Sequence, residues 1–172
     1  RVCLLRDLGS ALAPDNAFAI IQGLETVALR MKQHCENAEK VVNFLKKHKE
    51  VTKVIYSTEH NKPIAYRAKK YLKGGNGPMV GIELKGGFEA GKKFIESLKM
   101  FYHVANIGDA RSLAIHPAST THSQLNEKEL AASGVTQSYV RLCIGLEHID
   151  DIIEDLDQAL NKSSKGSLKA VS

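Results

Sequence analysis

Cysteines are few in this sequence, and long apolar runs are missing, which bounds the class of protein. The three cysteines, Cys3, Cys35 and Cys143, are widely spaced and odd in number. This argues against a disulfide framework and fits a reducing compartment, so we expect a cytoplasmic protein. No apolar run approaches the roughly 20 residues that cross a bilayer, and no signal peptide is visible. We therefore expect no membrane as a partner.

Charged residues of one sign are also not concentrated in a single part of this sequence. The net charge is +5, and lysines gather between Lys40 and Lys53 and again near the C-terminus. These runs lack the repeated aromatic residues that surfaces for single-stranded nucleic acid combine with their cations. We interpret the lysines as solvated faces and expect no nucleic-acid partner. The hydrophobic content of 43% is sufficient for one large domain with its own core.

The segment from Pro14 to Glu50 carries one continuous apolar stripe. Its members recur every three or four residues, as on one face of a helix. They are Ile20, Leu24, Val27, Met31, Cys35, Ala38, Val42 and Leu45. The pattern lasts about 30 residues, roughly 45 Å, with Gly23 as a point of bending. A helix of this length usually extends beyond its own domain, so we predict a connector between two domains. Because the chain begins with Arg1 and not with methionine, we expect it to be a piece of a longer polypeptide.

Shorter patterns after residue 50 predict a small layered domain. Strands are expected over residues 51–57, 79–87, 102–107 and 138–145. Helices are expected within residues 58–78 and over 88–100, 126–134 and 147–160. Four strands with helices between them favour a small α/β or α+β domain. The predicted division is residues 1–50 for the end of a preceding domain and the long helix, 51–161 for the small domain, and 162–172 for a flexible tail.

One arginine has the chemistry of a binding residue. In the strand "SYVRLCIG", Arg141 shares a face with Tyr139 and Cys143, away from the more apolar face. A guanidinium there can hold a carboxylate through two parallel hydrogen bonds. The alternative is an ordinary exposed arginine on a strand, and this strand alone favours that alternative.

The stretch "NIGDARSLAIHPASTTH", residues 106–122, is polar and irregular between two apolar runs. His116 and His122 lie in it without a cysteine or an acid at metal-ligand spacing, so we expect no metal site. Its serine and threonine hydroxyls have no base nearby in the sequence. We interpret them as loop hydroxyls that bond to their own backbone. The composition of the chain and the spacing of its residues do not by themselves indicate a catalysed reaction.

Several long motifs resemble a known family. They are "LRDLGSALAPDNAF", "GLETVALRM", "GPMVGIELKGG", "NIGDARSLAIHPASTTH" and "VRLCIGLE". Together they resemble the Cys/Met-metabolism family of pyridoxal-phosphate enzymes, from about Leu4 to Leu160. The resemblance implies the C-terminal part of a fold-type I enzyme. It also implies a mainly antiparallel sheet of about four strands with helices on one face, preceded by a long interdomain helix.

The resemblance also assigns roles to residues. It implies that Arg141 binds the substrate α-carboxylate, that Asn106 lies near it, and that Thr121 supports the arginine. It places the pair Arg6 and Asp7 at the entrance of the active site. No catalytic residue is expected in this chain, because the lysine that forms the Schiff base with pyridoxal 5'-phosphate should lie upstream or on a companion chain. The only Thr-Lys pair, Thr52–Lys53, lacks the serine of the family motif, and we interpret Lys53 as a surface lysine.

Within the family, the motifs most resemble the O-acetylhomoserine sulfhydrylase branch. This implies γ-replacement of the acetate of O-acetyl-L-homoserine by sulfide or methanethiol, and a homotetramer of active dimers. One alternative is a methionine or cystathionine γ-lyase or γ-synthase. The alternative from another class is a truncated, non-catalytic module that lacks the cofactor lysine and only associates with a partner.

Overall fold

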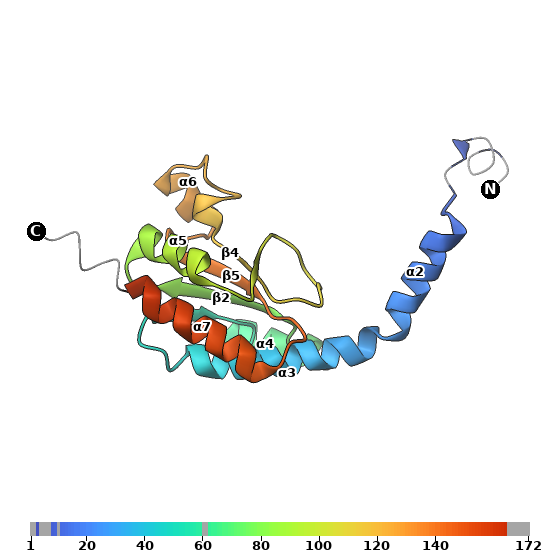
Figure 1. Ribbon diagram of the computed structural model, residues 1–172, viewed down its shortest axis with the longest axis horizontal. Coiled ribbons are helices and arrows are strands. Elements are labelled where there is room, and N and C mark those ends of the chain that lie inside the picture. The colour runs from blue at the N-terminus through green and yellow to red at the C-terminus, as the bar shows by residue number, and fades with distance from the viewer. Residues whose placement is uncertain (1–2, 4–7, 10, 60–61, 165–172) are drawn as a thin grey trace, which may run out of the picture. The chain divides into compact units, whose positions relative to one another are not determined.

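The computed structural model describes residue 3 and residues 8–9, 11–59 and 62–164 (Figure 1). The predicted entrance residues Arg6 and Asp7, and residues 165–172 of the predicted tail, lie outside the described residues. The chain divides into two compact units, one ending at Met31 and the other beginning at Lys32. Among the described residues, no helix combines the length and the apolar content needed to cross a membrane.

The long helical stripe forms two helices in succession. These are α2, Pro14–Glu25, and α3, Val27–Leu45. Pro14 lies in the first turn, where its missing N–H costs no helical hydrogen bond. The single continuous helix was a wrong prediction, because the helix is interrupted at Thr26 (φ −107°, ψ 2°) and not bent at Gly23. The guanidinium of Arg30 donates to the carbonyl oxygen of Gly23 at 2.5 Å, so this oxygen keeps a partner beside the break.

The second unit is built on one five-stranded sheet. The strands are β1, Val51–Ile55, β2, Met79–Leu84, β3, Tyr102–His103, β4, Leu113–Ile115, and β5, Tyr139–Cys143. Their order in the sheet is β1-β2-β5-β4-β3. All neighbours are antiparallel except β3 and β4, which are parallel. The predicted mixed and mainly antiparallel class is confirmed, but the sheet has one strand more than predicted.

The additional strand, β4, lies inside the stretch that the sequence marks as irregular. It comprises only three residues, all of them buried, and the 3-10 turn η1, Pro117–Ser119, follows closely. Three consecutive apolar residues cannot display the alternation by which a strand is recognised. Its position matters for function, because β4 is the neighbour of β5 and places Ile115 opposite Arg141.

Helices cover one face of the sheet, as predicted. The covering helices are α3, α5, Gly87–Ser97, and α7, Ile149–Ser164, and Figure 1 shows α5 and α7 in front of β2 and β5. Alternate strand residues and one stripe of each helix form the core between them. Fully buried examples are Val41, Leu45, Ile82, Phe94, Val140, Leu142, Ile152 and Leu156. The period-two and period-3.6 patterns of the sequence therefore converge on one apolar layer.

The remaining helices are short and lie outside this layer. They are α4, Lys62–Tyr71, and α6, Glu127–Ala132. Asn126 and Glu129 cap the start of α6 reciprocally, and Gly134 (φ 79°) follows its end. The final helix, α7, extends through Ser164, so residues 162–164 of the predicted tail are helical, with Ser163 buried.

A buried carboxylate connects α7 to the end of α5. The side chain of Asp155 is 6% exposed. It accepts hydrogen bonds from the backbone N–H groups of Lys99 at 2.9 Å, Met100 at 2.8 Å and Phe101 at 3.3 Å. The amide of Gln158 donates to the same carboxylate at 3.0 Å. Asp155 thus accepts hydrogen bonds from backbone N–H groups of the segment that follows α5.

Candidate functional site

The face of the sheet opposite the helices carries Arg141. Cross-strand pairing places Ile55, Gly81, Arg141 and Ile115 in one row across β1, β2, β5 and β4. Side chains at paired positions point to the same face of a sheet. Because Gly81 has no side chain, the row is interrupted beside the guanidinium.

A depression of about 350 Å³ borders this row of residues. Arg141 and Tyr139 contribute from β5, and Tyr56 and Ser57 lie just after β1. The other lining residues are Ile55, Ile64, Met79, Val80 and Gly81. The lining is largely apolar, with the guanidinium as its cation. A mostly apolar concave site with few polar groups is the usual form of a small-molecule site.

The guanidinium of Arg141 is available for a ligand. Its side chain is half-buried, and within the described part of the chain no carboxylate is within ion-pair distance of it. A half-buried arginine without an internal acid is suited to bind an external anion, since its planar fork matches a carboxylate. The arrangement therefore favours the binding interpretation of Arg141 over that of an ordinary strand arginine.

The segment after Asn106 borders the same face. Burial raises the pKa of the Cys143 thiol, and the backbone of Gly108 and the guanidinium of Arg141 lower it by less. Further on, the Ser112 hydroxyl donates to Glu147 at 2.9 Å and accepts from the Gly145 N–H at 2.9 Å. These bonds fix the loop to the turn that follows β5.

Helix α3 also forms hydrogen bonds to the turn that follows β5. Buried His34 hydrogen-bonds to the carbonyl oxygen of Ile144 at 2.7 Å. Buried Asn37 donates to the carbonyl oxygens of Gly145 and Glu147, both at 3.0 Å. Two polar residues of α3 therefore hold the end of the strand that carries Arg141. Sequence reasoning missed them, because on the helical pattern they are merely polar positions next to an apolar stripe.

The structure does not bring every predicted site residue to Arg141. Asn106 is exposed, and its side-chain oxygen accepts a hydrogen bond from the backbone N–H of Ile107 at 2.9 Å. Thr121 is exposed, and its hydroxyl is hydrogen-bonded to His122 Nδ1 at 2.8 Å. Their roles toward a substrate stay predictions.

Lys53 is a partly exposed residue with a specific partner. Its ammonium lies 3.1 Å from the carboxylate of Glu83, and the two side chains are 59% and 19% exposed. Both residues belong to the face that carries Arg141, one row further along the strands. The interpretation of Lys53 as a surface lysine is compatible with this geometry, which adds an ion pair that fixes Glu83.

His116 is a structural residue at the other face of the sheet. It is fully buried and hydrogen-bonded through Nδ1 to the Ser119 hydroxyl at 2.9 Å and through Nε2 to the Gln137 carbonyl at 2.8 Å. The ring also packs against Phe88, with centroids 5.3 Å apart. Both nitrogens are used by the protein, which supports the structural interpretation of this histidine.

We expect a pH dependence of stability from His116. Burial lowers the pKa of His116 below 6.5, with His103 lowering it further and the Gln137 carbonyl and Glu89 opposing. The unfolded state then binds a proton more readily, so this contribution to stability is complete above about pH 6.5 and is lost as the pH falls below it. Thermal unfolding between about pH 8 and pH 5 should show this loss of stability.

His116→Gln should be less stable than the wild type at pH 8, and the difference in stability should narrow toward pH 5. An equal difference at both pH values would contradict the assignment.

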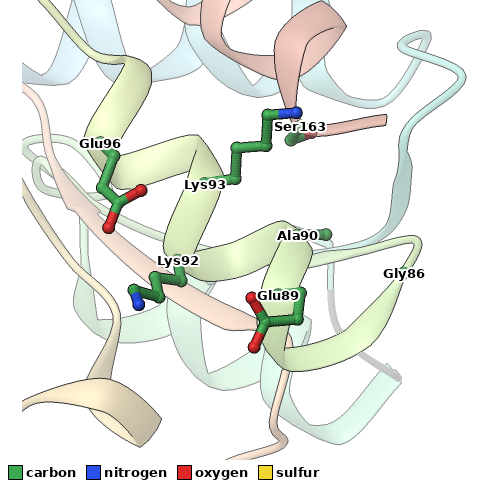
Figure 2. Close-up of a pocket in the computed structure, with 7 residues that line it drawn as sticks. All are labelled: Gly86, Glu89, Ala90, Lys92, Lys93, Glu96 and Ser163. Carbon is green, nitrogen blue, oxygen red and sulfur yellow. The ribbon is translucent and has the colours of Figure 1, made fainter. Parts of the chain in front are cut away.

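A second depression, of about 300 Å³, lies where α5 approaches the end of α7. Figure 2 shows its lining, with the carboxylates of Glu89 and Glu96 and the ammonium groups of Lys92 and Lys93 extending from α5. Lys93 extends toward Ser163, whereas Lys92 points away from it. Charges of both signs alternate along this helix and do not converge on one point. The arrangement is typical of a solvated helix surface.

The family motif for the cofactor lysine has one partial counterpart in this sequence, the pair Thr52–Lys53. Lys53, the lysine of the only Thr-Lys pair, is occupied by Glu83 and lies a row away from Arg141. What this part of the chain offers is a cation and an apolar depression. It therefore fits the side of a site that holds a substrate carboxylate.

Comparison with known proteins identifies the class and then the family. A crystal structure from Campylobacter jejuni subsp. jejuni, of a protein assigned as an O-acetylhomoserine (thiol)-lyase and containing N'-pyridoxyl-lysine-5'-monophosphate, superposes with a TM-score of 0.80 at 44% identity. It covers 93% of this chain, which spans 38% of that structure. The fold is thus that of part of a fold-type I pyridoxal-phosphate enzyme. Residues 2–161 match the profile of the Cys/Met metabolism PLP-dependent enzymes, and the chain belongs to this family.

Relatives within the family have more than one activity in their names. The O-acetyl-L-homoserine sulfhydrylase of Leptospira meyeri is 54% identical over 164 residues, which cover 93% of this chain and 36% of the relative. The L-methionine gamma-lyase of Fusobacterium nucleatum subsp. polymorphum is 45% identical over 159 residues, covering 92% of this chain and 40% of the relative. The chain therefore spans about two fifths of the length of these relatives.

Proposed function

We propose that this chain is the C-terminal segment of a pyridoxal-phosphate-dependent O-acetylhomoserine sulfhydrylase. The complete enzyme would replace the acetate of O-acetyl-L-homoserine by sulfide or methanethiol and release homocysteine or methionine. The observation that carries the proposal is the half-buried Arg141 beside the depression at Gly81, on a segment that is 54% identical to a sulfhydrylase. We further propose a cytoplasmic homotetramer built of active dimers.

Arg141 is the residue of this segment that determines how the substrate is held. Its two parallel N–H groups donate to the α-carboxylate, which fixes both the position and the orientation of the amino acid. Pyridoxal phosphate, bound upstream, supplies an electron sink. Holding the carboxylate throughout turnover keeps the reacting carbons aligned with the groups that move protons. Asn106 as a further donor, Thr121 as a support, and Arg6 with Asp7 at the entrance are secondary parts of the proposal.

The reaction assay that tests the proposal compares two products. We expect the complete enzyme to form homocysteine from O-acetyl-L-homoserine and sulfide much faster than it forms α-ketobutyrate from methionine. The reason is the higher identity of the segment to the sulfhydrylase, 54% against 45% for the γ-lyase. Both products can be measured with the same enzyme preparation. Dominant α-ketobutyrate release from methionine or cystathionine would instead assign a γ-lyase.

The second candidate is a non-catalytic module, favoured by the ion pair of Lys53, the lysine of the partial cofactor motif, with Glu83 at 3.1 Å. Intact mass and a visible spectrum of the protein purified from its source separate the two. A longer, yellow protein with an absorption band of bound pyridoxal phosphate is the result we expect. A colourless protein of 18.9 kDa would support the module.

A further inference from the structure

We propose that the phenol hydroxyl of Tyr139, whose ring lies over Gly81, is a second hydrogen-bond donor to the carboxylate that Arg141 holds. The inference rests on the function proposed above, since it needs a substrate carboxylate at Arg141. It adds a binding residue that the sequence alone does not indicate, because a tyrosine on a strand is an ordinary residue of a sheet.

The position of the Tyr139 ring supports this role. In the strand register Tyr139 is opposite Glu83, whereas Gly81 is opposite Arg141. The ring nevertheless leans across to Gly81. A Cβ atom at Gly81 would lie 2.7 Å from Cε2 and 2.8 Å from the hydroxyl oxygen of Tyr139. The phenol therefore lies at Gly81, the residue paired with Arg141, and Tyr139 and Arg141 both line the depression there.

The hydroxyl of Tyr139 is free to donate to a ligand. None of the described residues forms a hydrogen bond with it, and the acceptor opposite it, Glu83, is held by Lys53 at 3.1 Å. Burial raises the pKa of Tyr139, and Glu83 raises it further against the opposing influence of Arg141. The phenol consequently stays protonated at neutral pH, as a donor must.

The chemistry of a carboxylate accommodates both donors. An ionised carboxylate has about four acceptor positions, and the fork of Arg141 occupies two of them. The phenol can then donate to one of the remaining lone pairs. A hydrogen bond to a charged acceptor is worth about a tenfold or greater change in affinity. Gly81 is required because any side chain there would occupy the place of the ring.

The test is Tyr139→Phe in the complete enzyme, with Tyr71→Phe as the matched control. Tyr71 is an exposed tyrosine of α4 and does not line the depression. We expect Tyr139→Phe to raise the KM for O-acetyl-L-homoserine by about tenfold, with kcat changed by less than about twofold. Competitive inhibition by propionate, which offers only a carboxylate, should weaken by a similar factor. The control should change neither quantity.

Two further variants, Gly81→Ala and Arg141→Lys, separate a failure of the role of Tyr139 from a failure of the proposed function. Gly81→Ala should displace the Tyr139 ring and raise both the KM and the propionate inhibition constant. In the double variant Gly81→Ala with Tyr139→Phe, both constants should differ little from those of Tyr139→Phe alone. Unchanged constants in Tyr139→Phe, together with a raised KM in Arg141→Lys, would overturn the role of Tyr139 and leave the proposed function standing. Unchanged constants in both variants would overturn the proposed function as well.

Discussion

Arg141→Ala in the complete enzyme is expected to lower kcat/KM for O-acetyl-L-homoserine by about 10² to 10⁴-fold. The change removes two charge-assisted hydrogen bonds, each worth about 1.5–3 kcal/mol. The loss should be seen mainly as a raised KM, because the carboxylate is bound in both the ground state and the transition state. A smaller decrease in kcat is expected as well, since a loosely held substrate is less well oriented.

Two variants control this result. Arg141→Lys keeps the charge and loses the planar fork, so we expect an effect between those of the wild type and the alanine variant. Arg67→Ala removes an exposed arginine of α4 that does not line the depression, and its kinetics should match the wild type. Steady-state kinetics with saturating sulfide measures all three. Wild-type kinetics in Arg141→Ala would refute the assignment of the carboxylate site.

Asp155→Ala is expected to cost about 3 kcal/mol of stability. The substitution removes the carboxylate that accepts from the backbone N–H groups of exposed Lys99, half-buried Met100 and buried Phe101. Unsatisfied buried donors cost about 1–3 kcal/mol each, and water can satisfy part of them after the change. Asp155→Asn retains one acceptor oxygen and should fall between the wild type and the alanine variant.

The neighbouring Glu154 provides the control for Asp155. It is exposed on the same helix, so Glu154→Ala should change the free energy of unfolding by no more than about 0.5 kcal/mol. Denaturant unfolding followed by a signal of this domain measures the three variants. Equal stability of Asp155→Ala and Glu154→Ala would show that the carboxylate does not hold the end of α5 as the geometry indicates.

The core of the fold could be predicted because it depends on periodicity. The residues at Cys35, Ala38, Val42 and Leu45 continue the apolar stripe and are buried, as an amphipathic helix requires. The strand of Arg141 was predicted from its alternation in the same way. Two elements were missed for physical reasons. The strand β4 is too short to show a period, and the break at Thr26 is a change in backbone conformation that no local residue type demands.

Only part of the candidate site could be predicted from the sequence. Arg141 can be selected from the family resemblance, because the resemblance concerns the residue itself, whereas its strand alone does not select it. The depression beside it depends on Gly81, which lies on another strand and is opposite Arg141 only through the register of the sheet. The pairing of Lys53 with Glu83 arises from the same register. Such cross-strand neighbours are properties of the folded sheet and not of any short motif.

The most direct measurement compares O-acetyl-L-homoserine with its carboxamide in the complete enzyme. Replacing the carboxylate by an amide removes the charge that Arg141 is proposed to bind and leaves the reacting carbons unchanged. We predict that the wild type prefers the carboxylate in kcat/KM by about 10²-fold or more, and that Arg141→Ala has almost no preference. A preference that persists undiminished in Arg141→Ala would contradict the central claim that this residue recognises the substrate carboxylate.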